Sequence, residues 1–112
     1  MNVSISSHGA ARVIVPQGRI DSVTSEEFER RLLEEWGRGA RWFVFDLSAL
    51  EAITSGGLRV FVSLAKRLRE EGGMRFAGLK PAVKQVFDLT GLSLRVELFP
   101  ARADALADYP PG

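Results

Sequence analysis

The sequence has no cysteine, a single histidine and no apolar segment approaching the length of a membrane span. The absence of cysteine excludes disulfides, thiol catalysis and thiolate metal sites together. The N-terminus also lacks a basic leader and an apolar signal core, so we expect a cytoplasmic protein without membrane insertion. The net charge is only +1, and the basic residues are interleaved with glutamates, so no direct nucleic-acid partner is indicated.

What is present is a composition close to the average for a globular protein. Apolar residues make up 46% of the 112 positions and charged residues make up 26%. This length suits one compact domain with a substantial core and is too short for two. We therefore expect a single domain over residues 1–112, with a flexible tail at 108–112.

Strand and helix patterns alternate along the chain. The strand-like segments are a hairpin over residues 3–15, a strand covered on both faces at 42–45, and two short strands at 74–79 and 92–98. The helix-like segments are residues 24–36, residues 56–71, a helix opened by the proline at 81 and closed by the glycine at 91, and a small terminal helix at 100–106.

The start of the first helix carries two expected stabilising contacts. Thr24 and Glu27 have the spacing of a capping box, in which each side chain bonds the backbone of the other residue. Val23 and Phe28 have the spacing of a hydrophobic staple. We therefore expect both features at this helix terminus.

The loop between the strand at 42–45 and the helix at 56–71 ends in two hydroxyl residues, Thr54 and Ser55. One use of such a hydroxyl is structural, because it can accept a hydrogen bond from a free N–H of the first helical turn. The other use is as an exposed modification site on a loop that rigid elements hold in place. From position alone, both uses remain open.

The helix over residues 56–71 is predicted to be amphipathic. Residues at helical spacing that should face the core are Leu58, Phe61, Val62, Ala65 and Leu68. Arg59 and Ser63 should point outward, with Val60 at the flank, and these three adjoin Ser55. They form either a partner-binding face or an ordinary solvated stripe.

The residues give little support for catalysis, a metal or a cofactor. His8 falls in the predicted hairpin turn, which leaves Ser55 without an evident general base. Asp21, Asp46 and Glu51 match no metal-binding spacing, and we expect Asp21 to orient the loop before the first helix and Asp46 to bond backbone at the strand end. No phosphate-binding glycine motif is present. We therefore expect neither an enzyme nor a bound metal or cofactor.

Four segments in the same order and spacing resemble the STAS domain family of bacterial anti-sigma-factor antagonists and of the cytosolic parts of sulfate transporters. They are Gly18-Arg19-Ile20-Asp21, Val44-Phe45-Asp46-Leu47-Ser48, Ile53-Thr54-Ser55-Gly56-Gly57-Leu58 and Leu89-Thr90-Gly91-Leu92. The resemblance implies an α/β fold with a mixed sheet of four or five strands and helices mainly on one face.

The resemblance also implies a function. Ser55 matches the serine that a partner kinase phosphorylates in the family, while Thr54 replaces the usual aspartate and is a second candidate acceptor. The implied protein is an anti-sigma-factor antagonist that binds an anti-sigma serine kinase, releases a sigma factor for transcription, and is reset by a serine phosphatase. The alternative is a scaffold subunit that is not phosphorylated, for example in a phospholipid-transport ATPase complex. The expected partner-binding residues are Asp21, Thr54, Ser55, Gly56, Gly57, Arg59, Val60 and Ser63.

Overall fold

Apolar strands and amphipathic helices alternate in the structure, a computed structural model that describes residues 1–111. The strands are β1 (Val3–His8), β2 (Ala11–Pro16), β3 (Gly18–Ile20), β4 (Trp42–Asp46), β5 (Leu50–Ile53), β6 (Gly73–Ala77) and β7 (Glu97–Phe99). The helices are α1 (Ser25–Gly37), α2 (Ser55–Leu68), α3 (Pro81–Leu89), α4 (Arg102–Leu106) and the short 3-10 helix η1 (Leu92–Leu94). Within these described residues, the structure has no helix with the length and apolar character needed to cross a membrane.

Five strands form one mixed sheet in the order β1-β2-β4-β6-β7. The first two pair as the predicted antiparallel hairpin, and the remaining neighbours pair in parallel. Strand β4 lies at the centre with Phe43, Val44 and Phe45 fully buried. The prediction of a central strand covered on both faces is confirmed, as is the mixed α/β sheet.

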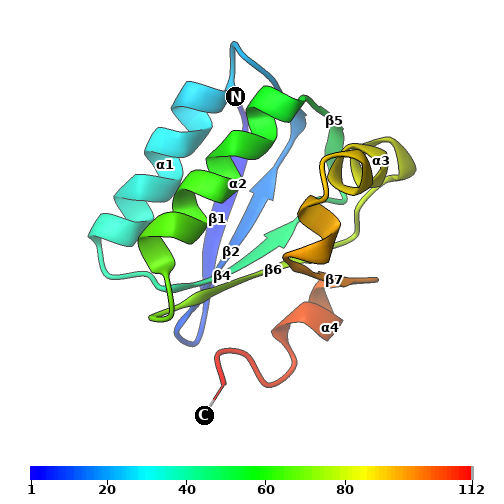
Figure 1. Ribbon diagram of the computed structural model, residues 1–112. Helices are drawn as coiled ribbons and strands as arrows, with labels where there is room; N and C mark the ends of the chain where they lie inside the picture. Colours follow the sequence, from blue (N-terminus) through cyan, green and yellow to red (C-terminus); the bar gives the residue numbers. More distant parts are fainter. Residues whose placement is uncertain (112) are drawn as a thin grey trace.

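Helices α1, α2 and α3 lie on one face of the sheet (Figure 1). The core on this face is a cluster of phenylalanines around Phe61 of α2. Its ring lies 4.9 Å from the rings of both Phe45 and Phe76, and it contacts Phe28 of α1 edge to face at 5.8 Å. Aromatic pairs in these orientations add to the stabilisation from apolar burial. The cluster therefore fixes α1 and α2 against the central strands.

The opposite face of the sheet is covered by α4 and the segment that follows it (Figure 1). Tyr109 is buried there and meets Trp42 edge to face, with ring centroids 5.4 Å apart. The Arg75 guanidinium lies 4.1 Å from the Tyr109 ring and donates hydrogen bonds to the carbonyls of Ala105 and Ala107. The expectation of a flexible tail at 108–112 therefore does not extend to Tyr109, and Gly112 lies outside the described residues.

A second sheet was not predicted from the sequence. Strands β3 and β5 pair in parallel, with Ile20 opposite Ile53, and form a separate two-stranded sheet. Both strands are short and precede helices, so their patterns are easily taken for loops. This pairing matters because it places the start of α1 beside the start of α2.

The predicted strand at 92–98 is also partly wrong. Residues Leu92–Leu94 form η1 instead, and only Glu97–Phe99 pairs as a strand. Alternating leucines suggested the longer strand, but Leu94 is 91% exposed. The turn begins at Gly91, whose φ of 78° is left-handed and closes α3 as expected.

Candidate functional site

The parallel pairing of β3 and β5 brings the two sequence motifs around Asp21 and Thr54 together. The Thr54 N–H donates to the Ile20 carbonyl at 3.0 Å. Asp21 and Thr54 thus follow adjacent strands at the same end of this small sheet. Loops at the carboxyl ends of parallel strands are where α/β proteins place functional residues.

The two hydroxyls at the start of α2 have different surroundings. Thr54 is the N-cap, and its Oγ1 accepts a hydrogen bond from the Gly57 N–H at 3.1 Å. Ser55 is the first residue of the helix and is exposed. Within residues 1–111, no group is hydrogen-bonded to the Ser55 hydroxyl. The structural use identified from the sequence therefore falls to Thr54, which leaves the Ser55 hydroxyl free.

The paired glycines after Ser55 are not equivalent. A Cβ at Gly57 would lie 2.5 Å from the Ile20 carbonyl oxygen, so the close approach of α2 to β3 requires glycine there. A Cβ at Gly56 would meet only Thr54 Oγ1, at 3.7 Å. Gly57 is buried and Gly56 is exposed. Of these two predicted contact residues, only Gly56 is open to a partner.

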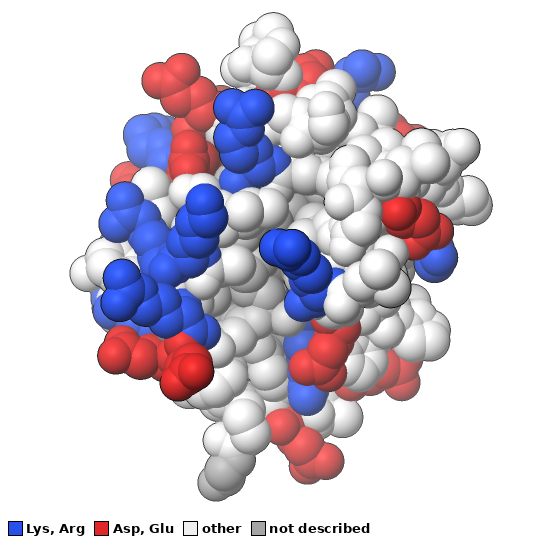
Figure 2. Space-filling view, viewed as in Figure 1, with Lys and Arg blue, Asp and Glu red and all other residues white. Residues whose placement is uncertain are grey.

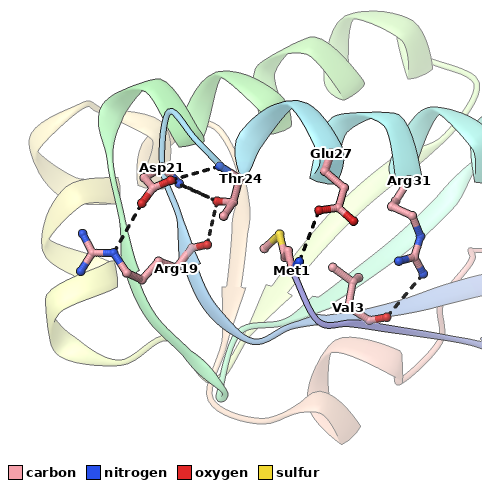
Figure 3. A network of polar contacts seen from close by, with 7 residues as sticks. All are labelled: Met1, Val3, Arg19, Asp21, Thr24, Glu27 and Arg31. Atoms are coloured by element: carbon pink, nitrogen blue, oxygen red, sulfur yellow. Dashed lines mark hydrogen bonds and ion pairs between the residues drawn. The ribbon is translucent and has the colours of Figure 1, made fainter.

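The loop before α1 is held by the Asp21 carboxylate (Figure 3). Asp21 Oδ1 accepts hydrogen bonds from the backbone N–H groups of Thr24 and Val23, at 3.1 Å and 2.9 Å, and Oδ2 lies 3.5 Å from Arg19 Nε. Hydrogen bonds from Thr24 and Val23 keep the pKa of Asp21 below its ordinary value, with a smaller contribution from Arg19. The predicted orienting role of Asp21 is confirmed.

The expected capping box and staple at the same helix are absent. The Thr24 side chain accepts from the Asp21 N–H at 3.0 Å and donates to the Arg19 carbonyl at 2.8 Å, so it organises the preceding loop (Figure 3). Its side chain caps no N–H of α1. Val23 is 84% exposed, although Phe28 is buried. The Asp21 hydrogen bonds orient this turn in place of the predicted contacts.

The buried face of α2 is rotated from the predicted one. Val60 is only 4% exposed, whereas Val62 is 37% exposed and Ala65 is also exposed. Helical periodicity alone predicted one buried face of α2. In the structure α2 packs beside α1 as well as against the sheet, and its buried face includes Val60. Val60 is therefore withdrawn as an exposed contact residue. Arg59 is exposed as predicted, and Ser63 is partly exposed.

A hollow of about 590 Å³ lies beside Ser55 and was not predicted from the sequence. One wall is the stripe of α2 that contains Ser55, Arg59 and Val62. The other wall is formed by residues 90–92 with Leu94 and Arg95. No sequence signal indicated it, because residues 92–95 were assigned to a strand. The hollow adds an apolar, positively charged surface next to the free hydroxyl.

The three carboxylates considered for a metal site have separate partners. Asp21 bonds the loop before α1, Glu51 pairs with Lys80, and Asp46 pairs with Arg102 at 2.8 Å. Burial opposes ionisation of Asp46, but hydrogen bonds from Ser48 and Arg102 outweigh it and lower its pKa. His8 ends β1, at the other end of the sheet from Ser55 (Figure 1). The structure therefore engages the three carboxylates in separate interactions and places His8 far from Ser55.

Lysine and arginine side chains cluster on the face of the molecule formed by α1 and α2. Figure 2 shows Lys and Arg side chains over the part of this face where α1 and α2 lie, with Asp and Glu mostly toward its edges. The exposed cations of α2 are Arg59, Lys66 and Arg67. The surface next to Ser55 thus favours an acidic ligand or partner surface.

Known proteins resemble this chain over nearly its full length. The STAS domain family model matches residues 2–105. BtrV of Bordetella bronchiseptica, provisionally named an anti-sigma factor antagonist, is 38% identical over 85 residues, covering 75% of this chain and 71% of BtrV.

Solved structures of anti-sigma factor antagonists also resemble this chain. The crystal structure of an anti-sigma factor antagonist from Mycobacterium paratuberculosis has a TM-score of 0.88 and 29% identity, covering 95% of this chain and 91% of the other. SpoIIAA in its unphosphorylated form has a TM-score of 0.82 and 18% identity, over 96% and 94% of the two chains. Bacillus SpoIIAA in its phosphorylated form has a TM-score of 0.74 and 16% identity, over 95% and 97%. The SpoIIAA likeness establishes shared fold alone, whereas the match of the family model shows that this chain belongs to the STAS domain family.

Proposed function

We propose that this chain is an anti-sigma-factor antagonist controlled by phosphorylation of Ser55. Unmodified, it binds an anti-sigma serine kinase in the cytoplasm and thereby frees a sigma factor, so its effect on transcription is indirect. The kinase transfers the γ-phosphoryl group of ATP to Ser55 Oγ, releasing ADP and a proton, and the modified chain dissociates. A serine phosphatase reverses the step. The chain itself acts by binding and catalyses nothing.

The observation that carries this proposal is the division of roles at the start of α2. The Ser55 hydroxyl is exposed and unbonded within the described residues, so it is available to a kinase. The Thr54 hydroxyl accepts from Gly57, so modification there would disturb the cap. Ser55 is therefore the acceptor and Thr54 a structural residue.

The fold has a physical reason to tolerate a phosphate at this position. Phosphorylation adds about −1.5 to −2 charges and three acceptor oxygens. A helix N-terminus favours negative charge, because its free N–H groups and dipole point toward it. SpoIIAA, which shares the fold, has been described in both unphosphorylated and phosphorylated forms. Phosphorylation is therefore expected to change the surface and leave the fold intact.

The proposed partner surface surrounds Ser55. It comprises Asp21 and Thr54 at the strand ends, together with Gly56, Arg59 and Ser63 on α2. A partner packed on this surface would meet the new dianion at close range and lose affinity. To test the surface, Arg59→Glu with Ser63→Glu should weaken kinase binding far more than Arg30→Glu with Arg31→Glu on α1. Equal losses from both pairs would indicate nonspecific electrostatics.

Phosphotransfer itself tests the acceptor assignment. Incubation with the cognate anti-sigma kinase and ATP should label the parent chain and Thr54→Ser, and should fail to label Ser55→Ala. Circular dichroism of each variant checks that the fold is retained. Undiminished labelling of Ser55→Ala would transfer the role to another residue. No labelling of the parent by a verified active kinase would instead favour the unphosphorylated scaffold.

A further inference from the structure

The hollow beside Ser55 has an apolar floor and a positively charged rim. Leu58 and Leu92 form the buried floor. Arg59 and Arg95 lie on opposite walls and are both exposed. The described residues that line the hollow include neither an aspartate nor a glutamate. A covalently attached anion at Ser55 would therefore enter a space with two cations and no lining carboxylate.

Eight of the fifteen lysines and arginines form ion pairs within the described residues, and these two arginines are not among them. Arg19, Arg30 and Arg102 pair with Asp21, Glu34 and Asp46, respectively. Neither Arg59 nor Arg95 forms an ion pair with any residue that the structure describes.

Two carboxylates near the hollow are already engaged, whereas Glu26 and Glu29 of α1 line the groove on the other side of Arg59 and form no ion pair within the described residues. Asp21, which follows β3, bonds the loop before α1, and Asp88 of α3 pairs with Lys84 at 2.9 Å. A guanidinium without a carboxylate partner is well suited to bind phosphate oxygens, often through two parallel hydrogen bonds. The charges around the hollow therefore leave Arg59 and Arg95 available to a new anion.

Both arginines line the same hollow as Ser55. Ser55 and Arg59 are four residues apart on α2, so their Cβ atoms are neighbours at about 6 Å. Arg95 follows η1, where its N–H donates to the Leu92 carbonyl at 2.9 Å. The left-handed Gly91 sets the direction of this wall. The hollow thus lies between α2, which carries Ser55 and Arg59, and the segment around η1, which carries Arg95.

We propose that Arg59 and Arg95 form a receiving site for the phosphate monoester on Ser55. This inference rests on the proposed phosphorylation and adds a mechanism to it. The dianion draws Arg59 from the partner surface into an intramolecular contact at the hollow. Phosphorylation therefore removes a positive contact as well as adding a negative charge, and both changes weaken an interface with an acidic partner.

The test uses the full chain with phosphoserine installed at residue 55 during translation, so no kinase is needed. ³¹P NMR titration gives the second pKa of the phosphate. Nearby guanidinium groups stabilise the dianion, so this pKa should be about one unit lower in the parent than in Arg59→Ala with Arg95→Ala. Lys66→Ala, on the same helix about three turns from Ser55, is the matched control and should leave the phosphate pKa unchanged.

A second readout follows the arginines directly. The Nε–Hε signals of Arg59 and Arg95 should shift on phosphorylation and follow the phosphate titration. An unchanged phosphate pKa in the double variant, with the variant shown to be folded, would overturn the receiving site. A lowered phosphate pKa in a chain that still binds its kinase partner equally well would support the receiving site while refuting phosphorylation-controlled release.

Discussion

The starts of α1 and α2 lie side by side after the parallel strands β3 and β5, yet they are built in opposite ways. Before α1, the Asp21 carboxylate accepts from the N–H groups of Val23 and Thr24, so the turn already contains its own negative charge. Before α2, Thr54 supplies a neutral cap, and Ser55 keeps a free hydroxyl.

This difference explains why the start of α2, rather than the start of α1, can accept a reversible negative charge such as a phosphate. A phosphate near Asp21 would meet a carboxylate, whereas a phosphate on Ser55 meets free N–H groups and the unpaired Arg59. The resemblance to the STAS family suggests an aspartate at position 54, and the chain has a neutral threonine there. The loop before α2 is therefore available for an added anion.

The largest expected effect on stability is at Gly57, where α2 approaches β3, with Gly56 as the comparison. Gly57→Ala should lower the free energy of unfolding by about 1 to 3 kcal/mol, because the new Cβ would overlap the Ile20 carbonyl oxygen. Gly56→Ala should be neutral or stabilising by up to about 1 kcal/mol, since alanine is the better helix former and the space is open. Urea unfolding measures both. Equal effects would show that the close approach to β3 does not constrain this helix start.

A smaller contrast separates the two hydroxyls of the loop. Thr54→Ala should cost about 1 kcal/mol, because the Gly57 N–H loses its acceptor. Ser55→Ala should change stability by no more than about 0.5 kcal/mol, since its hydroxyl bonds no described residue. Thermal and urea denaturation give the comparison. A larger loss from Ser55→Ala would reverse the assigned roles.

The charge at the start of α1 should appear as a pH dependence. The pKa of Asp21 is lowered from 3.8 by the N–H groups of Thr24 and Val23, so its contribution to stability is present above pH 3.8. That contribution is lost as the pH falls through the lowered folded-state pKa. The stability difference between the parent and Asp21→Asn should therefore shrink between neutral and strongly acidic pH. A difference that stays constant in urea unfolding over that range would contradict the assigned charge.

A small effect is also expected from a negative charge at the open helix start. Ser55→Asp should remain folded, with a free energy of unfolding within about 1 kcal/mol of the parent value. Raising the salt concentration should reduce any gain, because exposed charges are screened. A loss of several kcal/mol on calorimetric unfolding would show that this turn does not accept an anion.

Much of this architecture could be predicted from the sequence, because regular patterns mark long elements. The buried run from Phe43 to Phe45 and the helical spacing after Ser55 identified the central strand and α2. The rotation of α2 could not be predicted, since α2 packs against α1 as well as against the sheet, and Val60 is buried. Periodicity describes one helix at a time and does not report its neighbours.

The contacts around the site were harder to predict than its position. Ser55 was placed at a helix start, but the pairing of β3 with β5 involves only a few residues and gave no recognisable pattern. The turn at Leu92 to Leu94 has alternating leucines that imitate a strand, so the second wall of the hollow was missed. Short elements depend on tertiary packing, and their sequence signals are correspondingly weak.

Calorimetric titration of the purified anti-sigma kinase with two forms of this chain tests phosphorylation-controlled binding most directly. One form carries an unmodified Ser55, and the other carries phosphoserine at residue 55. A chain with phosphoserine at the exposed Ser7 of β1 supplies the same charge at a distant position. We predict that phosphoserine at residue 55 weakens binding by about tenfold or more, and that the Ser7 control binds like the parent. Equal affinity of the parent and the chain phosphorylated at residue 55, with both folded, would contradict phosphorylation of Ser55 as the switch.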